Sequence, residues 1–340
     1  MGQSLAVKYR PTTLDQVCGQ RSIIKILTAQ ATSKSLSSAY LFCGSSGIGK
    51  TTIARAFASL INDGAGKPVE IDAASHNGVD AIRPLLQSAT ERALDCEYKV
   101  IILDECHVLS TAAWNVFLKS LEEPTEYTIF ILCTTDPQKI PATILNRVQR
   151  FNFQRLSLDA VKQRLQFICQ QEHFTDYDAS IDYIAKQADG GMRDAIALLE
   201  RAASYSTSLT IDNVMEAIGS SSFEDLFGFV DSFVDGKVDA LLNYIEQYHQ
   251  DGGDVKLFVD QLLEFVVDLG KYSMFHDLRT TRIPAIYEDK LKYTVKFKDS
   301  TAMFVWLTER ILDIKNTLKK DASPKIALEA MVLTSCKELG

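Results

Sequence analysis

A glycine-rich segment of this 340-residue chain has the composition and spacing of a phosphate-binding loop. Residues 44–51 match G-x-x-x-x-G-K-[ST], directly after an apolar run and directly before a helical one. The glycines allow backbone N–H groups to surround a phosphate, and the helix N-terminus adds partial positive charge. Lys50 is expected to bridge the β- and γ-phosphates and Thr51 to bind Mg²⁺. The sequence thus predicts an ATP site made by Gly44, Ser45, Ser46, Gly47, Ile48, Gly49, Lys50, Thr51 and Thr52.

A second apolar run ends in two acidic residues, Asp104 and Glu105. In a parallel sheet, both carboxylates would emerge at the edge where the phosphate loop also opens. Asp104 would hold Mg²⁺ through its water shell, and Glu105 would orient and polarise the attacking water. Such a pair could otherwise cap the next turn, but an intact phosphate loop favours catalysis. We interpret His107 as a packing or hydrogen-bonding residue rather than a ligand.

A third apolar run ends in two hydroxyl side chains, Thr134 and Thr135. Either threonine could sense a γ-phosphate at the same sheet edge. Threonine is also a common strand residue, and this plainer explanation applies to Thr134 more than to Thr135. We therefore assign the catalytic role to Thr135 and leave the alternative open.

These residues must be positioned by an α/β domain, because short apolar runs alternate with helical stretches from Ala39 to Phe153. The pattern predicts a parallel sheet covered by helices. The expected strands are 39–43, 69–72, 99–103, 128–133 and 150–153. The expected helices are 51–60, 79–94, 111–121 and 141–146.

Beyond Leu156 the sequence predicts helices alone. Stretches 157–171, 178–189 and 192–205 indicate a small helical domain. Longer helical patterns follow at 223–234, 238–249, 255–275, 301–319 and 324–339. We predict an α/β domain at 1–155, a helical lid at 156–206 and an all-helical collar at 207–340.

Composition narrows the functional classes. Apolar residues make up 46% and charged residues 24%, with no apolar run long enough for a membrane span and no secretion signal, so we expect a cytoplasmic location and no membrane partner. The seven cysteines occur singly, without a C-x-x-C pair, so no zinc is expected. The net charge of −8 arises beyond residue 150, so any contact with nucleic acid needs a local basic patch on the N-terminal part.

Together, several motifs resemble those of AAA+ clamp-loader ATPase subunits, the gamma/tau type of bacterial DNA polymerase III. They are Lys8-Tyr-Arg-Pro11, Val17-Cys-Gly-Gln20, the phosphate loop, Glu70-Ile-Asp-Ala-Ala-Ser75, Leu103-Asp-Glu-Cys-His107, Leu118-Lys-Ser-Leu-Glu-Glu-Pro124, Cys133-Thr-Thr-Asp-Pro-Gln-Lys139 and Gly191-Met-Arg-Asp-Ala195. The resemblance is dense over residues 5–203. From 210 to 340 it consists of helical pattern only.

The resemblance implies roles that spacing alone does not assign. Arg147 matches the arginine finger that acts in trans on a neighbouring subunit's ATP, and Arg193 matches the lid arginine that contacts the γ-phosphate. The adenine pocket would be lined by Val7, Tyr9, Arg10, Pro11 and Val17. The matching candidates for DNA phosphate contacts are Arg83, Lys119 and Thr143.

The chain departs from the family pattern in three respects. Residues 62–67 replace the four-cysteine zinc insert of many members, and Asn146 and Val148 alter the flanks of the finger motif. The chain also stops near the end of the third expected domain, without the long extension of tau forms, which suggests a compact version.

By resemblance, ATP and Mg²⁺ would drive the loading of a ring-shaped sliding clamp onto primer-template DNA. The expected partners are that clamp, copies of the chain itself, and delta- and delta-prime-like subunits. A hexameric AAA+ DNA motor of the branch-migration type is an alternative, although a DNA-binding winged helix would then follow the lid. A non-hydrolysing scaffold subunit is a second alternative, although such subunits typically have a degraded phosphate loop.

Overall fold

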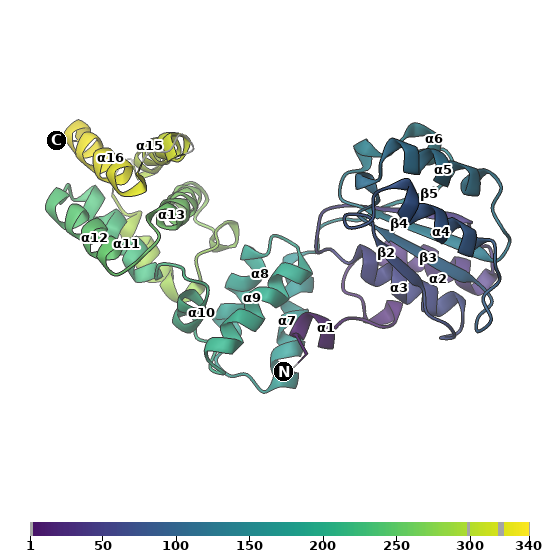
Figure 1. Ribbon diagram of the computed structural model, residues 1–340. Helices are drawn as coiled ribbons and strands as arrows, with labels where there is room; N and C mark the ends of the chain where they lie inside the picture. Colours follow the sequence, from purple (N-terminus) through teal and green to yellow (C-terminus); the bar gives the residue numbers. More distant parts are fainter. Residues whose placement is uncertain (1–2, 298–299, 319–322, 340) are drawn as a thin grey trace. The chain divides into compact units, whose positions relative to one another are not determined.

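The computed structural model describes residues 3–297, 300–318 and 323–339 (Figure 1). The chain divides into two compact units. The first comprises Met1–Ile168 with Ala188–Ala197, and the second comprises Cys169–Gln187 with Leu198–Gly340. The border between the units thus passes through two of the helices assigned to the lid, and the division into three domains stays a prediction.

The first unit contains the expected parallel sheet, in the order β2-β3-β4-β1-β5. Every residue of β1 and β4 is buried, which explains their continuous apolar sequences, because strands covered on both faces have no solvent side. All five strands were predicted to within one residue at either end. Their bounds are β1 Ala39–Cys43, β2 Val69–Asp72, β3 Lys99–Asp104, β4 Thr128–Thr134 and β5 Gln149–Asn152.

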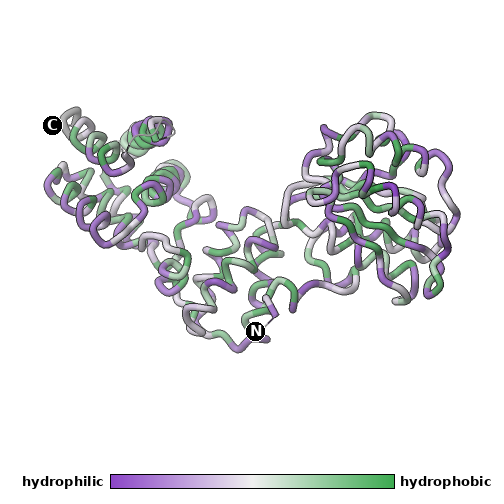
Figure 2. The backbone as a smooth tube through the Cα atoms, viewed as in Figure 1, coloured by the Kyte–Doolittle hydropathy of each residue, from purple (hydrophilic) through white to green (hydrophobic). Residues whose placement is uncertain are grey.

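Helices cover both faces of this sheet (Figure 1). Side chains alternate across each strand, so Tyr40 and Phe42 of β1 pack on one face and Leu41 on the other. Figure 2 shows the strands as a hydrophobic layer between the helices. One face carries α2 Arg21–Ser33 and α3 Lys50–Ile61, and the opposite face carries α4 Val79–Ala89, α5 Thr111–Glu122 and α6 Ala142–Leu145.

Two expectations for this unit were wrong or incomplete. The helix expected at 79–94 ends at Ala89, because its buried stripe ends there and Leu94 beyond it is fully exposed. Helix α2 was not predicted at all. Its buried positions are Ile23 and Leu27, a stripe too narrow for the sequence pattern to reveal.

After β5 the described elements are helices, as predicted. In the second unit α13 packs against α15 and α12 against α16, around aromatic residues such as Phe227, Phe258 and Phe265. Helices α10 and α14 were not predicted, and Lys319 of one predicted helix lies outside the described residues. The bounds are α7 Leu158–Glu172, α8 Asp178–Gln187, α9 Met192–Tyr205, α10 Ile211–Ala217, α11 Phe223–Val234, α12 Val238–Gln250, α13 Val255–Phe275, α14 Glu288–Thr294, α15 Ser300–Leu318 and α16 Pro324–Leu339.

Within residues 3–297, 300–318 and 323–339, no helix combines the length and apolarity that a membrane span requires.

Candidate functional site

The predicted phosphate loop lines a cavity of about 350 Å³ in the first unit. The loop joins the end of β1 to the start of α3, at the carboxyl edge of the sheet. Gly44 has φ +151°, and a Cβ there would lie 2.8 Å from the carbonyl oxygen of Phe153. Gly49 has φ +101° directly before the helix. Only glycine tolerates these backbone conformations without strain, so the loop's shape depends on its composition.

Lys50 is nearly buried, at 6% exposure, and its ammonium group is turned toward the loop. Its Nζ donates hydrogen bonds to the carbonyl oxygens of Gly44 and Ser45, each at 2.8 Å. An ammonium group has three N–H donors, so a third is available for a ligand oxygen. Ser46, Gly47, Ile48, Gly49, Thr51 and Thr52 line the cavity. Gly44 and Ser45 are not among the lining residues, and their carbonyl oxygens hold Lys50.

The two predicted magnesium ligands are already adjacent. Thr51 Oγ1 donates to Asp104 Oδ2 at 2.7 Å, and Asp104 Oδ1 accepts from the backbone N–H of Glu105 at 3.0 Å. The pair therefore brings the start of α3 and the end of β3 to one point. In the described part of the chain, no group of three or more His, Cys, Asp or Glu side chains could hold a metal ion.

Glu105 also lines the cavity, and other motif residues hold its side chain. Its Oε2 accepts a hydrogen bond from Thr135 Oγ1 at 3.0 Å and lies 3.3 Å from Nδ1 of His107. Thr134 is fully buried, and its hydroxyl lies 3.2 Å from the same Nδ1. Neither threonine lines the cavity, so a direct phosphate contact by either one stays a prediction.

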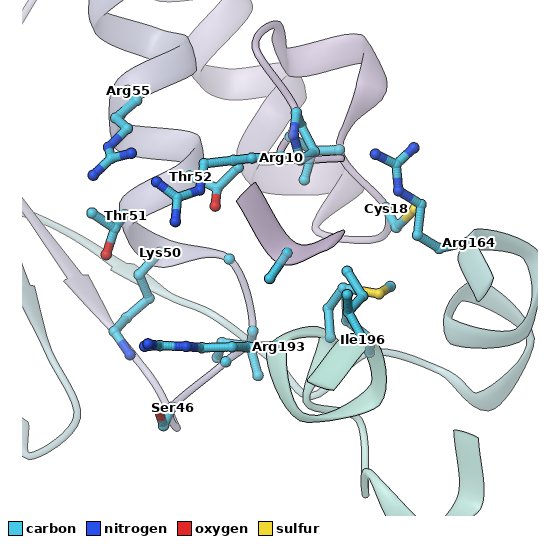
Figure 3. Close-up of a pocket in the computed structure, with 18 of the residues that line it drawn as sticks. Arg10, Cys18, Ser46, Lys50, Thr51, Thr52, Arg55, Arg164, Arg193 and Ile196 are labelled. Atoms are coloured by element: carbon cyan, nitrogen blue, oxygen red, sulfur yellow. The ribbon is translucent and has the colours of Figure 1, made fainter. Parts of the chain in front are cut away.

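Two of the cavity's arginines, Arg10 and Arg193, differ from Lys50 in their pairing. Within the described residues, neither the Arg10 nor the Arg193 side chain forms a hydrogen bond or an ion pair. Burial, and then the neighbouring Arg55, lower the pKa of Arg10, so a nearby anion would favour its charged form. Figure 3 shows Arg193 and Lys50 reaching toward the loop at Ser46. The backbone N–H of Arg193 also donates to the carbonyl oxygen of Gly47 at 3.3 Å.

The opposite end of the cavity is more apolar. Of the residues expected around adenine, Tyr9, Pro11 and Val17 line it, whereas Val7 does not and is 45% exposed. In the short helix α1 (Leu5–Lys8), Ala6 faces the cavity, and each further residue turns by about 100°. Residues that the sequence analysis missed complete this end, namely Cys18, Leu156, Arg164, Met192 and Ile196 (Figure 3).

Arg55 is a further cavity residue that was not predicted. It lies four residues after Thr51 on α3, and this helical spacing was the signal that could have revealed it. Its guanidinium forms an ion pair with Glu70 on β2, with Nη2 donating to Oε2 at 2.5 Å. Arg164 had no such local signal, although it too is held in place by donating to the carbonyl oxygen of Tyr9 at 2.5 Å.

The remaining predicted residues lie outside the cavity. Arg147 is exposed, and it donates to the carbonyl oxygen of Thr143 at 2.7 Å and to Glu122 Oε1 at 2.8 Å. Arg83 on α4 and Lys119 on α5 are exposed on helices that pack together. Among the described residues, neither cation has an ion-pair partner.

Family models and named relatives both show similarity between this chain and subunits of DNA polymerase III. Residues 69–157 match the family described as DNA polymerase III, delta subunit, and residues 160–208 match the ATPase lid domain of DNA polymerase III clamp loader subunits. The chain is 33% identical to DNA polymerase III subunit tau of Bacillus subtilis, over 98% of this chain and 63% of that protein. It is also 33% identical to DNA polymerase III subunit tau of Escherichia coli, over 71% of this chain and 41% of that protein. It thus spans less than two thirds of these relatives.

Solved structures support the fold alone. RuvB of Thermotoga maritima, described as a Holliday junction branch migration motor, superimposes with a TM-score of 0.53 at 19% identity, over 72% of this chain and 86% of that one. A single-residue variant of the same protein gives 0.54 at 18% identity, with the same coverage. These values indicate a shared fold.

Proposed function

This chain belongs to the gamma/tau family of AAA+ clamp-loader subunits, and on that premise we propose that it hydrolyses ATP to load a ring-shaped sliding clamp onto primed DNA. The observation that carries the proposal is the convergence of Lys50, Thr51, Asp104 and Glu105 on one cavity at the carboxyl edge of the sheet. These four groups provide a phosphate cation, two oxygen ligands for a metal and a candidate base. Phosphoryl transfer to water requires such a set.

The residues fit ATP and Mg²⁺. The cavity holds the glycine loop at one end and apolar side chains at the other, which matches a polyphosphate joined to a base. Thr51 and Asp104 present the hard oxygen ligands that Mg²⁺ prefers. When bound, the metal supplies charge neutralisation at the phosphate oxygens.

Each side chain then has a separate task. Lys50 donates to a phosphate oxygen through its third N–H while the loop carbonyls hold the other two. Glu105 accepts a proton from the attacking water, and Thr135 holds its carboxylate. Arg193, at the N-terminus of α9, contacts the γ-phosphate, so its helix would respond to the difference between ATP and ADP.

Assembly with other subunits is a further part of the proposal. Arg147 is exposed and lies outside the cavity of its own chain, as a finger acting in trans must. Its ion pair with Glu122 holds it in place at the surface before assembly. Copies of this chain, with delta- and delta-prime-like subunits, would place Arg147 at a neighbour's ATP. The collar helices would supply most of the contact between subunits.

Binding of primed DNA is the last part of the proposed assembly. Arg83 and Lys119 are exposed cations without ion-pair partners in the described residues, so their charge is available to a phosphate backbone. Thr143 is exposed as well, near the start of α6.

The alternatives are weaker. A branch-migration motor is expected to carry a winged helix after the lid, whereas the described elements from α10 to α16 are helices. A scaffold subunit is expected to have a degraded phosphate loop, whereas Lys50, Thr51 and Glu105 all occupy the site here.

The test is a loading assay with purified subunits and a fluorescent clamp. Closed clamps should accumulate on primed circular DNA with ATP but not with a non-hydrolysable analogue. ATP turnover should rise when clamp and primed DNA are both present. Turnover that responds instead to branched DNA, without the clamp, would favour the motor.

A further inference from the structure

His107 follows the two acids of the site and has no task in the proposed mechanism. It belongs to η2 (Cys106–Val108), a single turn directly after Glu105. Its neighbour Cys106 is fully buried in the core beside β1, β3 and β4, and the His107 side chain is only 13% exposed. The turn therefore holds the imidazole ring close to the reacting groups instead of in solvent.

One nitrogen of this ring faces two oxygens. Nδ1 lies 3.3 Å from Oε2 of Glu105 and 3.2 Å from Oγ1 of Thr134. The hydroxyl of Thr134 is held in place, because it accepts the backbone N–H of Asp136 at 3.0 Å. Oε2 of Glu105 also accepts the hydroxyl of Thr135 at 3.0 Å. The ring thus stands between the proposed base and an immobile hydroxyl group.

The tautomer of the ring decides whether it supports Glu105. A neutral imidazole has one N–H donor and one acceptor nitrogen. With hydrogen on Nδ1, the ring donates to the carboxylate. With hydrogen on Nε2, the Nδ1 lone pair accepts from Thr134 and faces the carboxylate oxygen, so two acceptors oppose each other at 3.3 Å. The carboxylate position seen here therefore requires the Nδ1–H form.

The backbone of Glu105 adds a second argument. Its φ of +48° lies in the left-handed region, which is unfavourable for a residue other than glycine. Contacts of the surrounding side chains must offset this cost. We infer that His107 is a positioning residue, which with Thr135 holds the Glu105 carboxylate ready to act on water. The inference rests on the proposed hydrolysis.

Matched substitutions test the role in steady-state kinetics. His107→Leu removes the donor, whereas His107→Asn keeps an amide near the position of Nδ1. Because small displacements of a catalytic group can cost about 100-fold in rate, we expect His107→Leu to lower kcat by about 10- to 100-fold. KM and ATP affinity should not change, and His107→Asn should recover most of kcat. His249→Leu, at an exposed histidine on α12, is the control.

Two kinetic outcomes would overturn the inference. One is a wild-type kcat in His107→Leu. The other is equal loss of kcat and ATP affinity in both variants, which would make His107 a packing residue.

A second measurement does not depend on hydrolysis. At one constant pH, imidazole nitrogen NMR of histidine-labelled protein should show His107 as Nδ1–H in the wild type, with its signals assigned by their loss in His107→Asn. In Glu105→Ala the ring should change to Nε2–H, because the acceptor is gone and Thr134 can donate. The same tautomer in both proteins would overturn the inference. A wild-type protein without ATP turnover would instead overturn the proposed function.

Discussion

Two sets of polar side chains line the cavity, and they differ in how completely they are paired. In the acid set, Lys50, Thr51, Asp104 and Glu105 all have hydrogen-bond partners. In the arginine set, neither the Arg10 nor the Arg193 side chain has a partner in the described residues.

This difference separates two tasks. Groups already held in their working geometry need no reorganisation when charge develops, which suits catalysis. Unpaired cations gain most from an incoming anion, which suits detection of the ligand. We therefore expect substitution of the Glu105 carboxylate to act on rate and substitution of the arginines to act on affinity. Lys50 is the exception in the acid set, because its third N–H is proposed to hold a phosphate oxygen.

The largest effect should come from an arginine outside the cavity. If Arg147 acts in trans, Arg147→Ala should lower turnover by about 10³- to 10⁵-fold while its own chain still binds ATP. Mixing Arg147→Ala chains with Lys50→Ala chains should restore partial hydrolysis, because each supplies what the other lacks. Arg150→Ala, at a neighbouring exposed arginine, is the control. No recovery in a demonstrated mixed assembly would refute action in trans.

In the acid set, substitutions of Glu105 and of Lys50 should have different effects. Glu105→Gln should lower kcat by about 10²- to 10⁴-fold, the usual contribution of a general base, with little change in ATP affinity. Lys50→Ala should abolish ATP binding because it removes the buried phosphate cation. Fluorescent nucleotide titration beside a phosphate-release assay separates the two. Equal loss of affinity in both variants would remove Glu105 from its assigned role.

In the arginine set, substitutions of the two cations should have different effects. A charged hydrogen bond contributes about 1.5–3 kcal/mol, so Arg193→Ala should weaken ATP binding by about 10- to 100-fold. ADP binding should not change, because ADP has no γ-phosphate. Arg10→Ala should weaken ATP and ADP alike, since Arg10 belongs to the predicted base end.

Calorimetry with both nucleotides measures this difference, and Arg193→Lys tests whether charge alone is enough. If Arg193→Ala weakened ADP binding as strongly as ATP binding, Arg193 would not be the group that detects the γ-phosphate.

The smallest effect concerns DNA. Replacing both Arg83 and Lys119 by alanine should reduce the slope of log affinity against log salt by about two units, one for each phosphate contact. Titration of primed DNA at several salt concentrations, with clamp and a non-hydrolysable analogue, gives the slope. Lys34→Ala is a suitable control because Lys34 is paired with Glu97 at 2.8 Å. An unchanged slope would place the DNA path elsewhere.

The sequence by itself determined the parallel sheet, the phosphate loop and the acidic residues of the site. Both depend on local rules, because alternating apolar runs specify the strands and a glycine-rich turn before a helix specifies the phosphate loop. Asp104 and Glu105 could be placed for the same reason, since they directly follow a buried strand. Arg193 was found through resemblance to a family, because no spacing links it to the loop.

Only the tertiary structure decided which distant residues complete the cavity. Arg164 and Leu156 reach it from segments more than a hundred residues beyond the loop, and no local pattern encodes such proximity. The same holds for His107, whose neighbours Thr134 and Glu105 are at the ends of adjacent strands. Hydrogen bonds between neighbouring strand ends depend on register and side-chain direction, and these are set when the sheet packs.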